Sequence, residues 1–169
     1  MDILCAVCGC ELGEHPTARG KVFAEYSLSD GLFRVSPGDL GVRALADRHY
    51  TRKHPGKGTW WSPALTLCLT NAERTVVFAW QWPKTEFRRD GQEGYNCVLF
   101  RNESERLASD IILEAEAMVV ATWGPGRAYT YVDASKIQSS NPGYCYLKAG
   151  WMRIGISKSG KVLLEKELA

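Results

Sequence analysis

Two tyrosines, Tyr144 and Tyr146, stand two residues apart near the C-terminal end of the chain. Their segment opens with Asn141 and Pro142 and closes with Gly150, which predicts a short helix capped by Asn141. A tyrosine hydroxyl can donate a proton to a leaving thiolate or alkoxide, as acyl transfer to an amine requires. Because residues two apart on a helix face different ways, we expect only one of the pair to face a substrate. The alternative is that one is a core aromatic with a bonded hydroxyl.

Asp133 and His49 are further residues whose types suit proton transfer. Asp133 ends a predicted strand, and the carboxyl ends of strands in α/β sheets often carry ligand contacts. His49 closes a predicted helix and precedes Tyr50, where it could serve as a general base or, with Asp133, as a metal ligand. Each has a structural alternative, because Asp133 could be a turn residue and His49 a favourable charge at a helix C-terminus.

The densest run of basic residues lies at 51–58, and two tryptophans follow it directly. Basic side chains that hold phosphates beside aromatics that can stack a base are what a nucleic-acid groove requires. The alternative is a solvated loop leading into a core strand with both tryptophans buried. The candidate nucleic-acid-binding residues are Arg48, Arg52, Lys53, Lys57, Trp60 and Trp61, with Arg88 and Arg89 in a later polar loop.

Cysteines crowd the N-terminus at Cys5, Cys8 and Cys10, with His15 five residues later. A Cys-x-x-Cys-Gly turn commonly supplies two zinc ligands, so these four residues predict a structural zinc site. The alternative is a tail with free thiols, since a second, well-separated ligand pair is missing. The other three cysteines lie in apolar stretches and are interpreted as small core residues: Cys68, Cys97 and Cys145.

The bulk properties fit one folded domain. The 169 residues are 45% hydrophobic and 24% charged, which argues for a folded globular protein and against disorder. A net charge of +2 is too small to imply nucleic acid by itself, so that inference depends on the clustering described above. Neither a membrane-length apolar run nor a basic signal-peptide start is present, so we expect a cytoplasmic protein without a membrane partner.

The alternation of apolar and turn residues predicts a mixed α/β (α+β) domain over residues 21–169, with helices packed on a central sheet, after a Cys-rich appendage at residues 1–20. The longest helix should bury Leu107, Ile111, Ile112, Ala115, Val119 and Thr122. The predicted elements are strands Val22–Tyr26 and Leu32–Val35, a helix capped by Ser36 and running to Tyr50, strands Leu65–Thr70, Thr75–Trp82 and Tyr95–Arg101, a helix capped by Asn102 or Ser104 and ending at Gly124, strand Tyr129–Asp133, the helix at 141–150, and strands Trp151–Ser157 and Val162–Leu168.

This order of elements resembles the GNAT acyltransferases over residues 36–169. Many of them follow their fifth strand with a helix that reads Asn, Tyr, a small residue and Gly-aromatic, and residues 141–151 are similar to it. The resemblance implies a twisted sheet with this helix at a splayed strand pair, and it favours Tyr146, four residues before Gly150, as the general acid.

A narrower resemblance is to the phage Mom-type proteins, a GNAT-like group that modifies the exocyclic amine of adenine in DNA. It is carried by the segments Asp47–Tyr50, Phe100–Ser104, Tyr129–Asp133 and Asn141–Cys145. It implies DNA as the partner, the host cytoplasm as the location and a catalytic set drawn from His49, Tyr50, Ser109, Asp133 and Tyr144 or Tyr146.

The sequence departs from GNAT proteins that bind acetyl-CoA in one loop. Those proteins carry a glycine-rich loop before the long helix, whereas residues 101–108 contain no glycine, and Glu103 and Glu105 would repel a pyrophosphate. The acyl donor is therefore either acetyl-CoA held in an unusual way or another activated acyl group, such as an aminoacyl ester. Two other functions stay open, a CoA-dependent acetyltransferase for a small amine and a non-catalytic zinc-containing nucleic-acid-binding module. The candidate donor-binding residues are Arg101, Ser104, Arg106 and Asn141.

Overall fold

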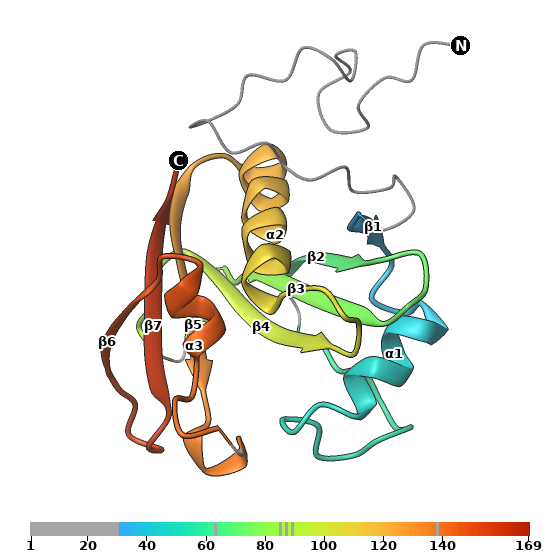
Figure 1. Cartoon of the computed structure of the whole chain (residues 1–169), viewed down its shortest axis with the longest axis horizontal. Coiled ribbons are helices and arrows are strands. Elements are labelled where there is room, and N and C mark those ends of the chain that lie inside the picture. Colours follow the sequence, from blue (N-terminus) through green and yellow to red (C-terminus); the bar gives the residue numbers. More distant parts are fainter. Residues whose placement is uncertain (1–30, 63, 85, 87, 89, 138) are drawn as a thin grey trace.

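The computed structural model describes residues 31–169 apart from 63, 85, 87, 89 and 138. These residues form a seven-stranded mixed sheet in the order β1-β2-β3-β4-β5-β7-β6, which confirms the predicted mixed α/β class (Figure 1). The predicted strand Val22–Tyr26 and the appendage at 1–20 lie outside the described residues. The strands are β1 (Phe33–Val35), β2 (Leu65–Thr70), β3 (Val76–Trp82), β4 (Tyr95–Asn102), β5 (Gly126–Val132), β6 (Met152–Ile156) and β7 (Val162–Leu168).

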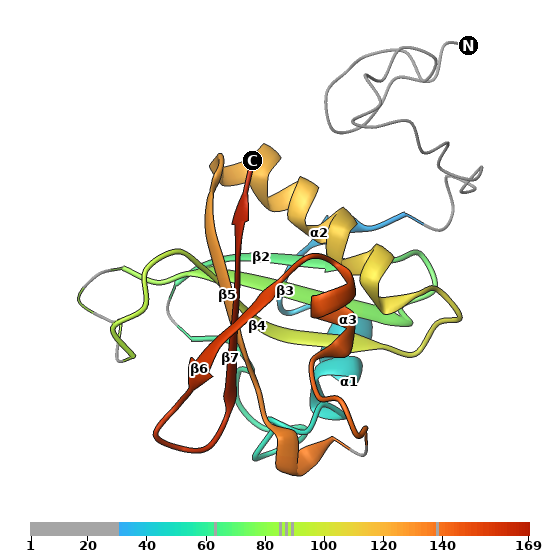
Figure 2. The same ribbon diagram turned by 60° about the vertical axis from the view of Figure 1, so that its left-hand side comes forward.

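In the described part of the chain, three α-helices cover the two faces of the sheet. Successive residues of β3 point to opposite faces, so Val77 and Ala79 pack with α1 (Leu40–Asp47) while Phe78 and Trp80 pack with α2 (Ala108–Trp123). The short helix α3 (Tyr144–Lys148) lies on the same face as α2 (Figure 2). Of the helices in the described part of the chain, none is long and apolar enough to cross a membrane.

The apolar stripe of α2 agrees with the predicted one in its centre and differs at its ends. Ile111, Ile112, Ala115 and Val119 are completely buried against the sheet. Leu107, however, is 68% exposed and Thr122 is also exposed, so their assignment to the core was wrong. Leu107 precedes the first turn of the helix, and Thr122 is exposed although the next residue, Trp123, contacts Trp82 and Tyr95 of the sheet.

The predicted N-terminal caps were wrong at all three helices, whereas the predicted end of the longest helix at Gly124 is confirmed. Asp39 caps α1, accepting a hydrogen bond from the N–H of Val42 at 3.0 Å, and the helix ends at Asp47. Ser36 therefore precedes the cap, and His49 and Tyr50 lie in the turn that follows the helix.

No side chain caps α2, because Leu107 occupies that position and the amide of Asn102 binds the N–H and hydroxyl of Ser104 instead. Gly143 occupies the cap position of α3 with a left-handed φ of 80°, which only glycine adopts readily. Asn141 accepts a hydrogen bond from Arg153 and does not cap the helix.

The feature that positions the candidate site is the separation of β4 from β5. These two strands are parallel and pair only from Tyr95↔Ala128 to Cys97↔Thr130, although β4 continues to Asn102 and β5 to Val132. The pairing of β4 with β3 jumps from Leu99 to Cys97, which leaves Val98 as a bulged residue at the same level. Figure 1 shows the two strands diverging from their paired ends, and α3 lies beside the gap. The helix at 141–150 was predicted at such a splayed pair.

A buried carboxylate joins the helices to the sheet behind this gap. Glu116 of α2 is 6% exposed and accepts a hydrogen bond from the indole N–H of Trp151 at 2.6 Å. Its second oxygen lies 2.5 Å from the Nζ of Lys166 on β7, and the same ammonium donates to the carbonyl of Ala149 at 2.6 Å. The network therefore holds the end of α3 against both α2 and β7.

Candidate active site

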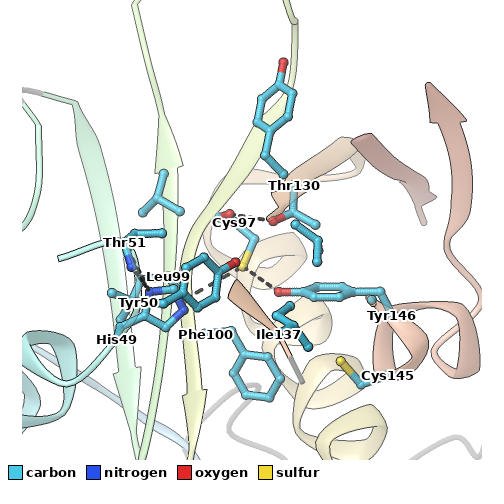
Figure 3. A pocket seen from close by; sticks show the side chains of 14 residues that line it. His49, Tyr50, Thr51, Cys97, Leu99, Phe100, Thr130, Ile137, Cys145 and Tyr146 are labelled. Atoms are coloured by element: carbon cyan, nitrogen blue, oxygen red, sulfur yellow. Dashed lines mark hydrogen bonds between the residues drawn. The ribbon is translucent and has the colours of Figure 1, made fainter. Parts of the chain in front are cut away.

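A pocket of about 140 Å³ occupies the gap where β4 and β5 have separated (Figure 3). A cavity of this size accepts one small ring, as an engineered apolar cavity of about 150 Å³ accepts benzene. Its walls come from both faces of the sheet, because the missing strand pairing lets the turn after α1 approach α3. The lining residues are His49, Tyr50, Thr51, Cys97, Val98, Leu99, Phe100, Thr130, Tyr131, Val132, Ile137, Gly143, Cys145 and Tyr146.

The side chain of Tyr146 brings a buried hydroxyl to this pocket. It is 6% exposed, and its Oη lies 3.2 Å from the Sγ of Cys97, at the last paired position of β4. Burial raises the pKa of Tyr146 well above 10, so the phenol holds its proton at neutral pH. Tyr144 is 49% exposed and lies under the ammonium of Lys148, away from the pocket lining. The structure thus brings only one of the two tyrosines to the pocket.

The ring of His49 is held as a neutral imidazole in the pocket wall. Its Nδ1 lies 2.7 Å from the hydroxyl of Thr51, and the backbone of Phe100 also hydrogen-bonds the ring. Burial first, and then the positive charge of Arg101, lower the pKa of His49 to about 4. An imidazole with such a low pKa and with partners on its ring is a weak base. The geometry favours a positioning role over the expected general-base role.

Tyr50 lies across the open end of the gap. Its ring contacts that of His49 with a centroid distance of 4.3 Å, and it is 37% exposed. Burial raises the pKa of the Tyr50 hydroxyl, an effect that a hydrogen bond with the backbone of Asp133 partly offsets. Figure 3 shows the hydroxyls of Tyr50 and Tyr146 pointing toward one another on either side of the Cys97 thiol. The gap is therefore bridged by polar groups that come from three elements.

Besides Tyr144, two further candidate catalytic residues are not brought to the pocket. The Asp133 carboxylate caps the short 3₁₀ helix at Ala134–Lys136, accepting from the N–H of Ser135 at 3.1 Å and from its hydroxyl at 2.6 Å. These hydrogen bonds lower the pKa of Asp133. Ser109 lies in the first turn of α2, outside the pocket lining. The backbone of Asp133 contacts the site through its hydrogen bond with Tyr50. Its carboxylate stabilises the following turn, as the structural alternative predicted.

The two arginines among the candidate donor-binding residues are already engaged with carboxylates. Glu103 lies 2.5 Å from Arg101 and 2.6 Å from Arg48, and hydrogen bonds from these arginines, Arg48 first, lower its pKa to about 2. Arg106 lies 2.6 Å from Glu114, and Ser104 donates to Asn102. Glu105 and the first-turn Asp110 add further negative charge at this end of α2. The side chains before α2 therefore do not fit the diphosphate of CoA.

Most of the expected nucleic-acid-binding residues hold the protein together instead. Arg52 is 10% exposed at its side chain, pairs with Asp47 at 2.6 Å and donates to the carbonyls of Thr59 and Lys57, so it closes the basic loop from within. Arg48 is engaged by Glu103 as described above.

Both tryptophans after the loop are half-buried, and Trp60 packs against the core, which agrees in part with the structural alternative. Trp60 donates to the carbonyl of Pro37 at 2.9 Å and packs against the core beneath α1, while Trp61 meets its ring edge-on. Arg88 pairs with Glu93 at 3.3 Å and donates to the carbonyl of Pro83. Only Lys53 and Lys57 of the described candidates are exposed without an ion pair. Arg89 lies outside the described residues.

The predicted zinc ligands Cys5, Cys8, Cys10 and His15 all lie outside the described residues. Within the part of the chain that the structure describes, no group of three or more His, Cys, Asp or Glu side chains could hold a metal ion. A metal shared by His49 and Asp133 is therefore unsupported.

The pocket residues that the sequence did not identify as site residues include Cys97 and Thr130. Cys97 was interpreted as a core residue and Thr130 was not singled out, yet the Thr130 hydroxyl donates to the Cys97 carbonyl at 2.8 Å and both line the pocket. Their common feature is their place as the last pair of the parallel ladder, which depends on strand pairing and leaves no local pattern. Comparisons of the chain with protein-family models, with curated proteins and with solved structures give no match.

Proposed function

We propose that the pocket between β4 and β5 is the active site of a GNAT-like transferase that moves an acyl group onto the amine of a nucleobase in DNA. The observation that carries the proposal is the buried, protonated hydroxyl of Tyr146 in a gap between two parallel strands. The DNA acceptor rests on the resemblance of four short segments to the Mom-type proteins. The pocket volume is consistent with it, because a space of about 140 Å³ can receive the reacting edge of one base.

The reaction needs a polarised carbonyl and an acid for the leaving atom. Beyond Cys97, the edge of β4 that faces the gap has no strand partner in the described sheet, so its backbone N–H groups can stabilise a developing oxyanion. The amine nitrogen forms the new C–N bond as the bond from the carbonyl carbon to the leaving atom breaks. Tyr146 gives its phenolic proton to the leaving atom and recovers one from the amine, by way of the Tyr50 hydroxyl that faces it, so the protons balance.

His49 supports this arrangement as a positioning residue. Because its ring is fixed between Thr51 and the backbone of Phe100 and contacts the ring of Tyr50, it sets the direction in which the Tyr50 hydroxyl points. The donor is an activated acyl group other than conventionally bound CoA, since the arginines before α2 are neutralised by carboxylates. An aminoacyl ester has the required chemistry and carries no diphosphate next to its acyl group.

Mass spectrometry of nucleosides from DNA of cells that express the protein tests this proposal. We expect a new modified nucleoside with the parent protein, and a loss of about 100-fold or more with Tyr146→Phe, which removes only the acid. Tyr144→Phe is the matched control, because this tyrosine is exposed and should leave the yield unchanged. Equal yields from the two variants would contradict the assigned acid.

A second candidate is an N-acyltransferase for a small amine. The observation that favours it is the internal engagement of Arg52 and Trp60, which removes much of the surface expected for nucleic acid. If cells that express the protein contain no new nucleoside and the purified protein acylates a free amine in a Tyr146-dependent way, this second function becomes the better account.

A further inference from the structure

Positive charge gathers at one end of the molecule, where three loops lie. They are residues 51–59 after α1, residues 133–143 after β5 and the turn at 157–161 between β6 and β7, and Figures 1 and 2 both show them at the lower end. The described residues of these loops carry a single carboxylate, that of Asp133. Their five lysines, here called the lysine rim, are Lys53, Lys57, Lys136, Lys158 and Lys161.

Among the described residues, the rim lysines differ from most of the arginines in having no carboxylate partner. None of the rim lysines forms an ion pair within the described residues, and four of the five are exposed. Charges that the fold does not neutralise remain available for an anionic partner. Seven arginines, in contrast, are each paired with a carboxylate: Arg48, Arg52, Arg74, Arg88, Arg101, Arg106 and Arg127.

The rim borders the mouth of the pocket. Tyr50 lines the pocket, is 37% exposed and bonds the backbone of Asp133, next to which Lys136 and Lys161 lie close enough to act on the carboxylate. Lys136 is also followed directly by Ile137, which lines the pocket. An anionic chain that lies along the rim therefore passes the opening that leads to Tyr146.

We propose that the lysine rim binds the phosphodiester backbone of DNA and holds a strand across the mouth of the pocket. Lysine ammonium groups bind phosphates as point charges and carry no base specificity, so the rim should bind DNA of any sequence. The inference deepens the proposed function, on which its biological meaning rests, and it replaces the Arg52 and tryptophan surface that the sequence predicted.

Salt-dependent binding of a fluorescein-labelled DNA duplex, followed by anisotropy, tests the rim. Lys136→Gln with Lys161→Gln should weaken binding and reduce the slope of log K against log salt concentration by about two, one for each lost phosphate contact. The control is Lys84→Gln with Arg34→Gln, which removes the same charge at exposed positions outside the rim and should bind like the parent. Lys136→Arg with Lys161→Arg keeps the charge and should also bind like the parent.

Three results would contradict the proposal that the rim binds DNA. They are parent-like binding by the Lys136/Lys161 glutamine variant, equal weakening by the control pair, and no binding of DNA by the parent at low salt. The failures of the two proposals are distinguishable. If the rim variant loses binding while the parent protein makes no modified nucleoside, the proposed reaction fails and the rim stands. If the nucleoside forms but both charge variants bind DNA alike, the rim fails and the reaction stands.

Discussion

The hydroxyl of Tyr146 lies 3.2 Å from the Sγ of Cys97, where the pairing of β4 and β5 ends. Burial raises the pKa of both groups, that of the Cys97 thiol to about 12, so each is protonated at neutral pH. The thiol therefore serves as a hydrogen-bond partner for the phenol and is not a nucleophile. Cys97 differs in this respect from the low-pKa cysteines of thiol enzymes.

We expect Cys97 to resist alkylation in the folded protein. With a pKa of about 12, its thiolate fraction at about pH 8 is on the order of 10⁻⁴. Peptide mass spectrometry after iodoacetamide treatment should find Cys97 unmodified in buffer and modified in urea. Rapid labelling of Cys97 in buffer would show that the thiol is ionised or exposed, and would count against its place beside Tyr146.

The neutral state of His49 should make stability depend on pH. Its pKa in the folded protein, about 4, lies below the ordinary value of 6.5, so the unfolded chain binds the proton more readily. The contribution of the neutral His49 ring to the free energy of unfolding is therefore complete above about pH 6.5, and it is lost as the pH falls toward 4. The full loss is about 3 kcal/mol, of which about 2 kcal/mol should be lost by about pH 5.

Urea unfolding at about pH 7.5 and about pH 5 measures this loss. His49→Gln should be less stable than the parent at the higher pH but should lose about 2 kcal/mol less on acidification, because glutamine does not titrate. His54→Gln is the control, since His54 is exposed. Parallel pH curves for the parent and His49→Gln would exclude the buried neutral imidazole.

Arg101 should affect the pKa of His49 through its charge and the position of His49 through a backbone hydrogen bond. Its guanidinium donates to the carbonyl of Arg48 at 2.7 Å, next to His49, and its charge is the second cause of the lowered pKa of His49. Arg101→Met should therefore raise the pKa of His49 from about 4 toward, but not to, 6.5, because burial remains. An NMR titration of the histidine ring resonances reads this out, and Arg34→Met, which removes an exposed charge on β1, should leave the His49 resonance unchanged.

The sheet was predictable because its strands carry local patterns. β2 and β7 have the predicted bounds, and β3 starts only one residue later than expected, since each is an apolar run bounded by turn residues. The caps were not predictable in the same way. Ser36 and Asp39 are both good caps three residues apart, and the choice depends on which start buries Val42 and Leu45 against β3.

The basic loop shows why the candidate site was harder to predict than the fold. A sequence gives the number of charges in a loop, but the partner of each charge is set by the fold. Arg52 was predicted to bind nucleic acid, but the turn after α1 places it against Asp47. Lys136 and Lys161 are far from the basic loop in the sequence, yet their loops lie at the same end of the molecule. Tyr146 was identifiable because its helix has a recognisable pattern, and Cys97 was not because its role comes from strand pairing.

The buried ion pair of Glu116 and Lys166 should be strongly coupled. Lys166→Met leaves the Glu116 carboxylate, 8% exposed at its side chain, without its cation, and removal of one partner of such a pair costs about 3 kcal/mol. Glu116→Gln removes the charge that needs the cation, so the double variant should lose less than the sum of the single losses, by about 1–3 kcal/mol. A double-mutant cycle of urea unfolding measures this coupling.

The matched control is the pair of Arg127 and Glu165, which lie 2.6 Å apart but are 23% and 26% exposed at their side chains. In this pair Arg127→Met and Glu165→Gln should couple by less than about 1 kcal/mol. Because Lys166 also binds the Ala149 carbonyl at the end of α3, its loss should loosen this helix. Equal coupling in the two cycles would mean that Glu116 is solvated in solution and does not fix α3.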